Sequence, residues 1–161
     1  MAIRNIRKIG DPILAKKSKE VGTLTPRLRE LIDDMFETMH EANGCGLAAV
    51  QVGILKRIVV IETDEESPYV LINPEILESS GEQKGYEGCL SVPDKSGMVT
   101  RPMKVKVQAL DENMEPFVLE GEGLLARAIC HECDHLNGEL YVDIVEGELV
   151  DNSQLDSEDE K

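Results

Sequence analysis

The sequence predicts an α+β domain, and three observations lead to that expectation. The length of 161 residues is typical of one domain. Apolar residues recur with helical spacing after Pro26, and again from about Gly123 to Asn137. Between these two segments lie several short runs with the composition of strands. Because the strands are grouped between two separated helices, we expect mixed or antiparallel β-sheets and not a repeating βαβ array.

The first predicted helix has a clear start. Thr25 suits an N-cap, and Pro26 suits the first helical position. Apolar side chains then follow with helical spacing, at Leu28, Leu31, Ile32, Met35 and Met39. The pattern stops before Gly44, so we expect the helix to end there.

Four segments read as strands. RIVVIE (57–62) and YVLINPEI (69–76) have the apolar content of buried strands, the second interrupted by Pro74. MKVKVQAL (103–110) alternates between apolar and polar residues. DEN (111–113) then predicts a hairpin turn into MEPFVLE.

The second predicted helix carries the string HECDH, an H-E-x-x-H motif. Positions i and i+4 share a helix face, so His131 and His135 could bind one cation with Glu132 beside it. Gly138 is well placed to end the helix. The motif also occurs by chance in unrelated proteins, but this chain has only three His residues and two of them lie here. Two ligands do not complete a site, so a third is needed.

Two glycine-rich segments offer better third ligands than the remaining histidine. His40 lies on the first helix among polar neighbours and is expected at the surface. YEGCLSVP (86–93) offers the thiolate of Cys89, and Gly88 would let the backbone approach closely. NGCGLAAVQVG (43–53) offers room for a ligand and the amide of Gln51.

The four cysteines are not expected to form disulfides, because nothing in the sequence indicates an oxidising compartment. Cys130 and Cys133 form a C-x-x-C string, which raises the alternative of thiol redox chemistry. That string lies inside a helical pattern and not at a helix start, where thiolates are stabilised, so redox chemistry is disfavoured.

Charge and hydropathy exclude several partners. A formal net charge of -15 repels phosphate backbones, so we expect no direct binding of nucleic acid. No apolar run approaches the roughly 20 residues of a membrane span, and no secretory signal is evident, so the expected location is the cytoplasm.

Residues 151–161 are acidic and nearly free of apolar side chains. We therefore expect residues 1–150 to form one catalytic domain and residues 151–161 a disordered tail.

Three segments taken together resemble a known family. GCGLAAVQVG, EGCLSVP and HECDH, in this order, closely resemble the three signature motifs of peptide deformylase. The resemblance includes the opening GDPIL and continues to about Val145. It implies β-sheets packed around a C-terminal helix that carries the metal-binding H-E-x-x-H motif.

The resemblance implies a metal-dependent hydrolase that removes formate from the N-terminal formyl-methionine of new polypeptides. Members bind one divalent metal, usually Fe²⁺, through residues that match Cys89, His131 and His135; Zn²⁺, Ni²⁺ and Co²⁺ also suit this donor set. Three protein ligands leave a fourth position for water. Glu132 matches the general base. The side chain of Gln51 and the backbone N–H of Leu90 match the donors to the developing oxyanion.

The same segments imply how a nascent N-formyl-Met peptide binds. An extended peptide could pair with backbone near Gly44 and Gly46 and so add a strand to a sheet edge. Gly88 would allow close approach on the metal-binding loop. The candidates for an apolar methionine slot are Leu90, Leu124, Ala128 and Cys45. Plain core packing is the competing interpretation for each of these side chains.

Three features depart from the family pattern. Many members have Pro where this chain has Val50, a difference expected to loosen the loop that carries Gln51. Many have Gln where it has Cys130, a difference expected to alter the surroundings of the metal. Some members end in a basic helix that docks on the ribosome, whereas this chain ends in acidic residues. We therefore expect at most transient proximity to the ribosome.

Two rival functions differ in class. A zinc peptidase would use the same Glu and water on ordinary amide bonds, with His or Glu as its third ligand. A non-enzymatic metal-binding module would need no oxyanion donor. Turnover of a formylated against an unformylated peptide separates these functions from deformylation.

Overall fold

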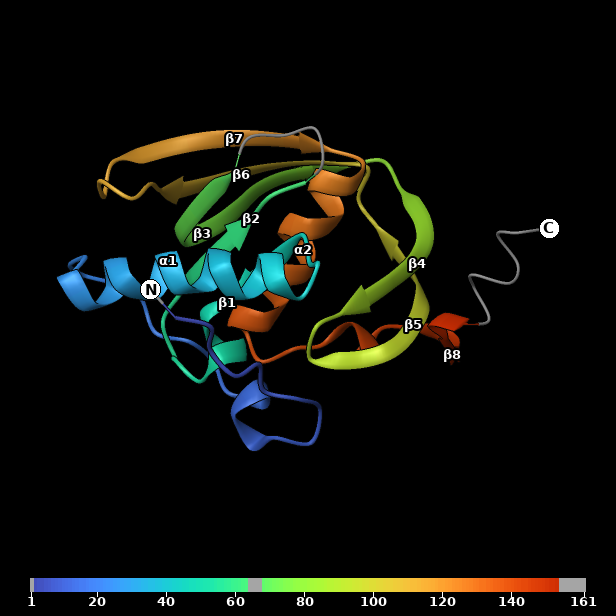
Figure 1. Ribbon diagram of the computed structural model, residues 1–161. Coiled ribbons are helices and arrows are strands. Elements are labelled where there is room, and N and C mark those ends of the chain that lie inside the picture. Colours follow the sequence, from blue (N-terminus) through green and yellow to red (C-terminus); the bar gives the residue numbers. More distant parts are fainter. Residues whose placement is uncertain (1, 64–67, 154–161) are drawn as a thin grey trace.

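The computed structural model describes residues 2–63 and 68–153, which form two β-sheets and two α-helices with short 3-10 turns (Figure 1). The helices are α1 (Pro26–Glu41) and α2 (Leu124–Leu136). The strands are β1 (Gly46–Ala48), β2 (Ile58–Ile61), β3 (Tyr69–Ser80), β4 (Gln83–Cys89), β5 (Val92–Arg101), β6 (Lys104–Leu110), β7 (Pro116–Glu122) and β8 (Glu146–Asp151). The α+β architecture predicted from the sequence is confirmed.

The strands pair antiparallel within each sheet. The larger sheet has the order β1-β2-β3-β6-β7, and the smaller one has the order β4-β5-β8. β1 and β4 are therefore edge strands, each with one side not paired to a neighbouring strand of its sheet. This arrangement leaves two sheet edges available beside the site described below.

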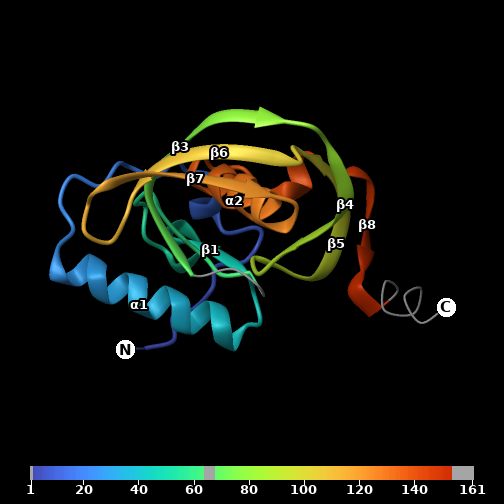
Figure 2. The same ribbon diagram turned by 90° about the horizontal axis from the view of Figure 1, so that it is seen from above.

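The β1–β2 part of the larger sheet lies between the two helices (Figure 2). In β2, Val59 and Ile61 belong to the cluster that packs on α2, whereas Ile58 and Val60 belong to the cluster that packs on α1. Side chains alternate across a strand, so a continuous apolar run is the pattern of a strand buried on both faces. Each such buried side chain contributes about 1.5–3 kcal/mol.

The predicted helix boundaries agree with the structure. The Thr25 hydroxyl accepts a hydrogen bond from the Leu28 N–H (3.2 Å), which confirms the N-cap, and the helix ends at Glu41, before Gly44. After α2, Gly138 has φ +80°, a conformation that favours glycine, and a side chain there would meet the Ala15 carbonyl.

The expected interruption of the second strand at Pro74 is wrong. β3 continues through Pro74 to Ser80, because its register with β6 shifts between Ile72 and Glu75. At such a bulge a proline removes no ladder hydrogen bond. Asn73 at the bulge has φ +51°, and its side chain donates to the Val21 carbonyl (2.9 Å) and accepts from the Val21 N–H (2.8 Å).

The short β1, the β4–β5 hairpin and β8 have no counterpart among the predicted strands. β8 pairs with β5 through Asp151, so the acidic tail expected from residue 151 begins inside a strand. Residues 154–161 of that tail lie outside the described residues. Among the described helices, none is long and apolar enough to cross a membrane.

Candidate active site

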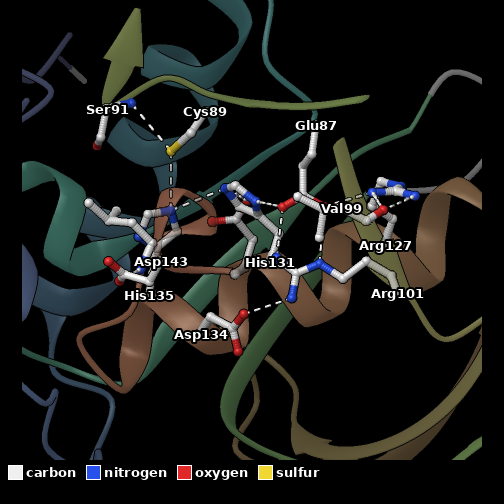
Figure 3. Close-up of polar contacts among 12 residues, drawn as sticks. Glu87, Cys89, Ser91, Val99, Arg101, Arg127, His131, Asp134, His135 and Asp143 are labelled. Carbon is white, nitrogen blue, oxygen red and sulfur yellow. Dashed lines mark hydrogen bonds and ion pairs between the residues drawn. The ribbon is translucent and has the colours of Figure 1, made fainter. Parts of the chain in front are cut away.

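Three potential metal ligands converge where β4 meets α2. Cys89 ends β4, and His131 and His135 lie one turn apart on α2. The Cys89 Sγ lies 3.3 Å from His135 Nε2, which lies 3.2 Å from His131 Nε2 (Figure 3). All three ligand atoms lie within 4.8 Å of one another. One thiolate and two imidazoles at such distances can bind a divalent metal.

A buried carboxylate fixes the orientation of His131. Glu87 Oε2 lies 2.6 Å from His131 Nδ1, which leaves Nε2 directed toward the other two ligand atoms. A metal-binding histidine commonly donates its second ring N–H to a carboxylate, which sets its tautomer. The arrangement therefore prepares His131 for coordination through Nε2.

Two arginines hold Glu87 in turn (Figure 3). Arg101 Nη2 lies 2.7 Å from Glu87 Oε2, and Arg127 Nη1 lies 3.0 Å from Glu87 Oε1. Arg101 also pairs with Asp134 on α2 at 2.7 Å. Burial alone would raise the pKa of Glu87, but hydrogen bonds from His131 and Arg101 lower that pKa to about 2. Glu87 is thus a carboxylate at neutral pH.

Glu132 lies next to the ligands without joining them. Its side chain is buried, its Oε2 lies 4.0 Å from His131 Nε2, and its Oε1 has no hydrogen-bond partner among the described residues. Burial raises the pKa of Glu132 to about 7. A carboxyl group with such a pKa can accept and return a proton near neutral pH.

The charges of the cluster suit a bound cation. Burial would lower the pKa of His131, but Glu132, Cys89 and Glu87 raise it well above its usual value. Burial, together with the neighbouring His131, holds the pKa of His135 well below its usual value. Negative groups thus favour positive charge at this point, and a divalent cation bound by the three ligand atoms would supply it. The residues fit a metal.

Gln51 presents an amide N–H₂ toward the cluster. Its Oε1 accepts the Ala48 N–H (2.9 Å), and its Nε2 donates to Ser91 Oγ (3.0 Å) and lies 3.6 Å from Cys89 Sγ. Because the Ala48 N–H requires an acceptor, the carbonyl of the amide faces Ala48 and its nitrogen faces Cys89. Gln51 is 1% exposed, so this orientation is held by its surroundings.

Glycines let the β1 segment approach the site closely. A Cβ atom at Gly46 would lie 2.6 Å from Glu132 Oε2, and one at Gly44 would lie 2.7 Å from Leu90 Cδ1. The site opens into a cleft of about 690 Å³. Its lining includes Gly44, Cys45, Gly46, Gln51, Glu87, Gly88, Cys89, Leu90, Leu124, Arg127, Ala128, His131, Glu132 and Asn152.

Comparison with known proteins identifies the family. Residues 3–149 match the family model of polypeptide deformylase. A peptide deformylase of Agathobacter rectalis is 60% identical over 159 residues, covering 99% of this chain and 100% of the relative. The chain belongs to the polypeptide deformylase family. It is an enzyme that removes the N-formyl group from newly made polypeptides.

Solved structures of the family share this fold. A peptide deformylase of Ehrlichia chaffeensis, in complex with actinonin, superposes with a TM-score of 0.89 at 41% identity, covering 91% of this chain and 90% of that one. A peptide deformylase of Legionella pneumophila has a TM-score of 0.86 at 47% identity, with coverage of 89% and 86%. At these identities and coverages the likeness spans most of both chains.

The structure brings the predicted site residues of the enzyme together. Every one of them except His135 lines the cleft, and His135 is fully buried. Leu124 is 53% exposed, and Cys45 is also exposed, so neither is a core residue. Ala128 is buried and also belongs to the core cluster on α2, so the structure places it in both surroundings.

Sequence reasoning missed the residues that hold the ligands in place. Glu87 lies two positions before Cys89, and residues i and i+2 of a strand face the same side. That signal would have been readable only if the polar, glycine-rich EQKGYEGC segment had been recognised as a strand. Arg101 and Asp134 are distant in sequence from Glu87, and no sequence signal links them.

The remaining sequence predictions have clear outcomes. His40 is exposed and lies 3.1 Å from Glu62, outside the cluster. Burial raises the pKa of the Cys130 thiol to about 11 and that of Cys133 to about 12, which argues against redox chemistry. Val50, where many members have Pro, is fully buried in the core.

Proposed function

We propose that Cys89, His131 and His135 bind one divalent metal and that Glu132 transfers the proton in deformylation. The observation that carries this proposal is the convergence of the three ligand atoms with the unpartnered Glu132 oxygen beside them. A metal bound there would supply a Lewis acid that lowers the pKa of a water molecule and polarises the formyl oxygen. Fe²⁺ is the ion we expect in the cell, and Zn²⁺, Ni²⁺ and Co²⁺ suit the same donors.

In the proposed reaction, water adds to the formyl carbon and the carbon–nitrogen bond breaks. Glu132 accepts the proton of the water and passes it to the departing amine, so that formate and a free N-terminus are released. The Gln51 side chain and the Leu90 N–H donate hydrogen bonds to the oxygen on which negative charge develops. The orientation of the Gln51 amide toward Cys89 supports its part in this assignment.

We propose that the peptide binds extended between the edge strands β1 and β4, along Gly44, Gly46 and Gly88. Both strands are sheet edges, and backbone pairing at an edge reads the main chain and tolerates many sequences. Leu90, Leu124, Ala128 and Cys45 then form the slot for the methionine side chain. Their place in the lining of the cleft supports this.

The proposal also covers the partners of the enzyme and its location in the cell. A net charge of -15 disfavours direct contact with ribosomal RNA, so the enzyme meets nascent N-formyl-Met chains without binding that RNA. We place the activity in the cytoplasm, where those chains emerge.

The Glu132→Ala variant tests the proposal. We expect about one metal per chain, as in the wild type, but a loss of turnover of about 10²–10⁴-fold on a formyl-Met peptide, because proton transfer is removed and the ligands are not. Metal content is measured by elemental analysis and turnover by formate release. Glu139→Ala, at an exposed glutamate just after the end of α2, is the control.

Two outcomes would contradict the assignment. If Glu132→Ala loses metal and activity together while the fold is intact, Glu132 is a ligand. If a Cys89→Ala, His131→Ala double variant keeps its full metal content, the ligand set is wrong.

A further inference from the structure

An extended segment at the N-terminus, residues 2–10 and here named the N-terminal arm, crosses both loops that carry the proposed oxyanion donors. The Arg7 N–H donates to the Gln51 carbonyl (2.6 Å), and the Ile9 N–H donates to the Ser91 carbonyl (2.8 Å). Ser91 follows Leu90 in the turn between β4 and β5. One short segment thus contacts the backbone of both loops. It does so at Gln51, which carries one proposed donor, and at Ser91, which follows the other donor, Leu90.

The two loops are also joined directly, by the hydrogen bond from Gln51 Nε2 to Ser91 Oγ (3.0 Å). The loops lie 40 residues apart in sequence, on different sheets. The arm adds a second connection, through its hydrogen bonds to the main chain of both loops. Its Arg7 guanidinium packs on Gly53, where a Cβ atom would lie 2.9 Å from Nη2.

The other end of the arm is fixed to α1. The Ala2 N–H donates to Asp34 Oδ1 (2.7 Å), the Arg4 N–H donates to Thr38 Oγ1 (2.9 Å), and the Arg4 side chain pairs with Asp34 (2.9 Å). The arm is therefore anchored on a helix at one end and hydrogen-bonded to the two donor loops at the other.

Core packing does not account for these contacts. Ile3 is 46% exposed and Ile9 is 49% exposed, so neither is a core residue. Ile6 and Lys8, on either side of Arg7, line the cleft itself. The two backbone N–H groups that donate to the Gln51 and Ser91 carbonyls hold the arm against both loops.

We propose that the main chain of Arg7 and Ile9 positions the two donor loops, so that Gln51 and Leu90 hold a fixed spacing as charge develops on the formyl oxygen. This inference rests on the proposed function of Gln51 and Leu90. Donors that act in the transition state must already be in place, because reorganising them during the reaction would cost part of their effect. Removing an arm hydrogen bond should therefore lower kcat and leave substrate binding and metal content largely unchanged.

Proline substitution removes a single backbone N–H and tests this directly. We expect Arg7→Pro and Ile9→Pro each to lower kcat about tenfold or more, with KM within about threefold of the wild-type value. The matched control is Asn5→Pro, in the same arm, because the Asn5 N–H makes no hydrogen bond among the described residues. Thermal unfolding and metal content are measured for all three variants.

A double-variant cycle separates this inference from the function on which it rests. In a Gln51→Ala background, Arg7→Pro should cost much less than in the wild type, because both changes act through one donor. If Gln51→Ala itself leaves kcat unchanged, the donor assignment fails. If Gln51→Ala is slow but Arg7→Pro and Ile9→Pro turn over like Asn5→Pro, only the positioning role fails. It fails as well if both proline variants unfold while Asn5→Pro folds, since the arm is then a general part of the fold.

Discussion

At the scale of single residues, the site depends on positions where side chains are absent as much as on its polar groups. Gly46 allows β1 to pass so close to α2 that a Cβ atom would lie 2.6 Å from Glu132 Oε2 and 3.1 Å from Glu132 Cγ. Glu132 is buried, with 4% of its surface exposed. The main chain of β1 therefore forms one wall of the space that keeps Glu132 beside His131.

We expect Gly46→Ala to lower kcat about 10–100-fold with little change in melting temperature. The added methyl group displaces the Glu132 carboxylate, and a displacement of about 1 Å can cost about 10²-fold in rate. Formate release and thermal unfolding measure the two effects. Gly22→Ala is the control, because a Cβ atom at Gly22 would have no neighbour within 4 Å. Wild-type turnover in Gly46→Ala would show that Glu132 tolerates the shift and is not positioned by β1.

The same residue scale shows where sequence reasoning reached its limit in the site. His131 and Glu132 could be singled out because the spacing of the H-E-x-x-H motif has a chemical reason, and Cys89 because its segment resembles a motif of the family. Glu87 was not, because its role depends on a strand alternation that the glycines around it obscure. Arg101 meets Glu87 only through the pairing of β4 with β5, a tertiary relation that no local pattern shows.

At the scale of elements, predictability followed the strength of the apolar pattern. β2 was predicted within one residue at each end, since a short continuous run of Ile and Val is typical of a buried strand. β4 is polar and glycine-rich and β5 has no regular apolar alternation, and they are strands because each satisfies the other's backbone. β8 is acidic and exposed over much of its length, so its pairing with β5 could not be read from hydrophobicity.

The junction between α1 and the N-terminal arm gives a prediction about stability. Asp34 is 2% exposed and accepts from the Ala2 N–H and the Arg4 side chain. Burial alone would raise the pKa of Asp34, but these two partners lower it below its usual value of 3.8. Since the folded-state pKa is depressed, this stabilisation is present above pH 3.8 and is lost as the pH falls through the folded-state pKa.

We therefore expect Asp34→Asn to reduce the free energy of unfolding by about 1–3 kcal/mol at neutral pH, because a buried charged acceptor is lost. The difference from the wild type should shrink as the pH falls below 3.8. Urea unfolding at a series of pH values measures it. Asp33→Asn, at an exposed position of the same helix, is the control and should change stability by less than about 0.5 kcal/mol. A difference that stays constant with pH would rule out the charge of Asp34 as the cause.

At the scale of the whole molecule, the site lies where three parts of the fold meet: α2, the larger sheet and the smaller sheet. α2 supplies two proposed ligands and Glu132, the edge of the larger sheet supplies Gly46 and leads into Gln51, and the edge of the smaller sheet supplies the third proposed ligand, Cys89. The core on both faces of the larger sheet fixes α2 relative to β1. The order of these parts was predictable as α+β, but the division into two sheets was not, because half of the strands lack a strong local signal.

The C-terminal segment carries the last prediction. Residues 154–161 contain almost no apolar side chains, so they have little with which to offset the cost of ordering. Before them, Asp151 pairs with Lys95, and Asn152 accepts from Ser96 Oγ (2.6 Å) and lines the cleft.

We expect a chain truncated after Ser153 to deformylate a short formyl-Met peptide at close to the full-length rate. Truncation after Val150 should instead raise KM and lower the free energy of unfolding by about 1 kcal/mol, because a hydrogen bond and a surface ion pair are lost. Steady-state kinetics and urea unfolding of the two truncated chains decide the matter. Equal KM values for both would show that Asn152 does not contact the substrate, and a loss of more than about tenfold in kcat after Ser153, about 1.4 kcal/mol of barrier, would show that the acidic end takes part in catalysis.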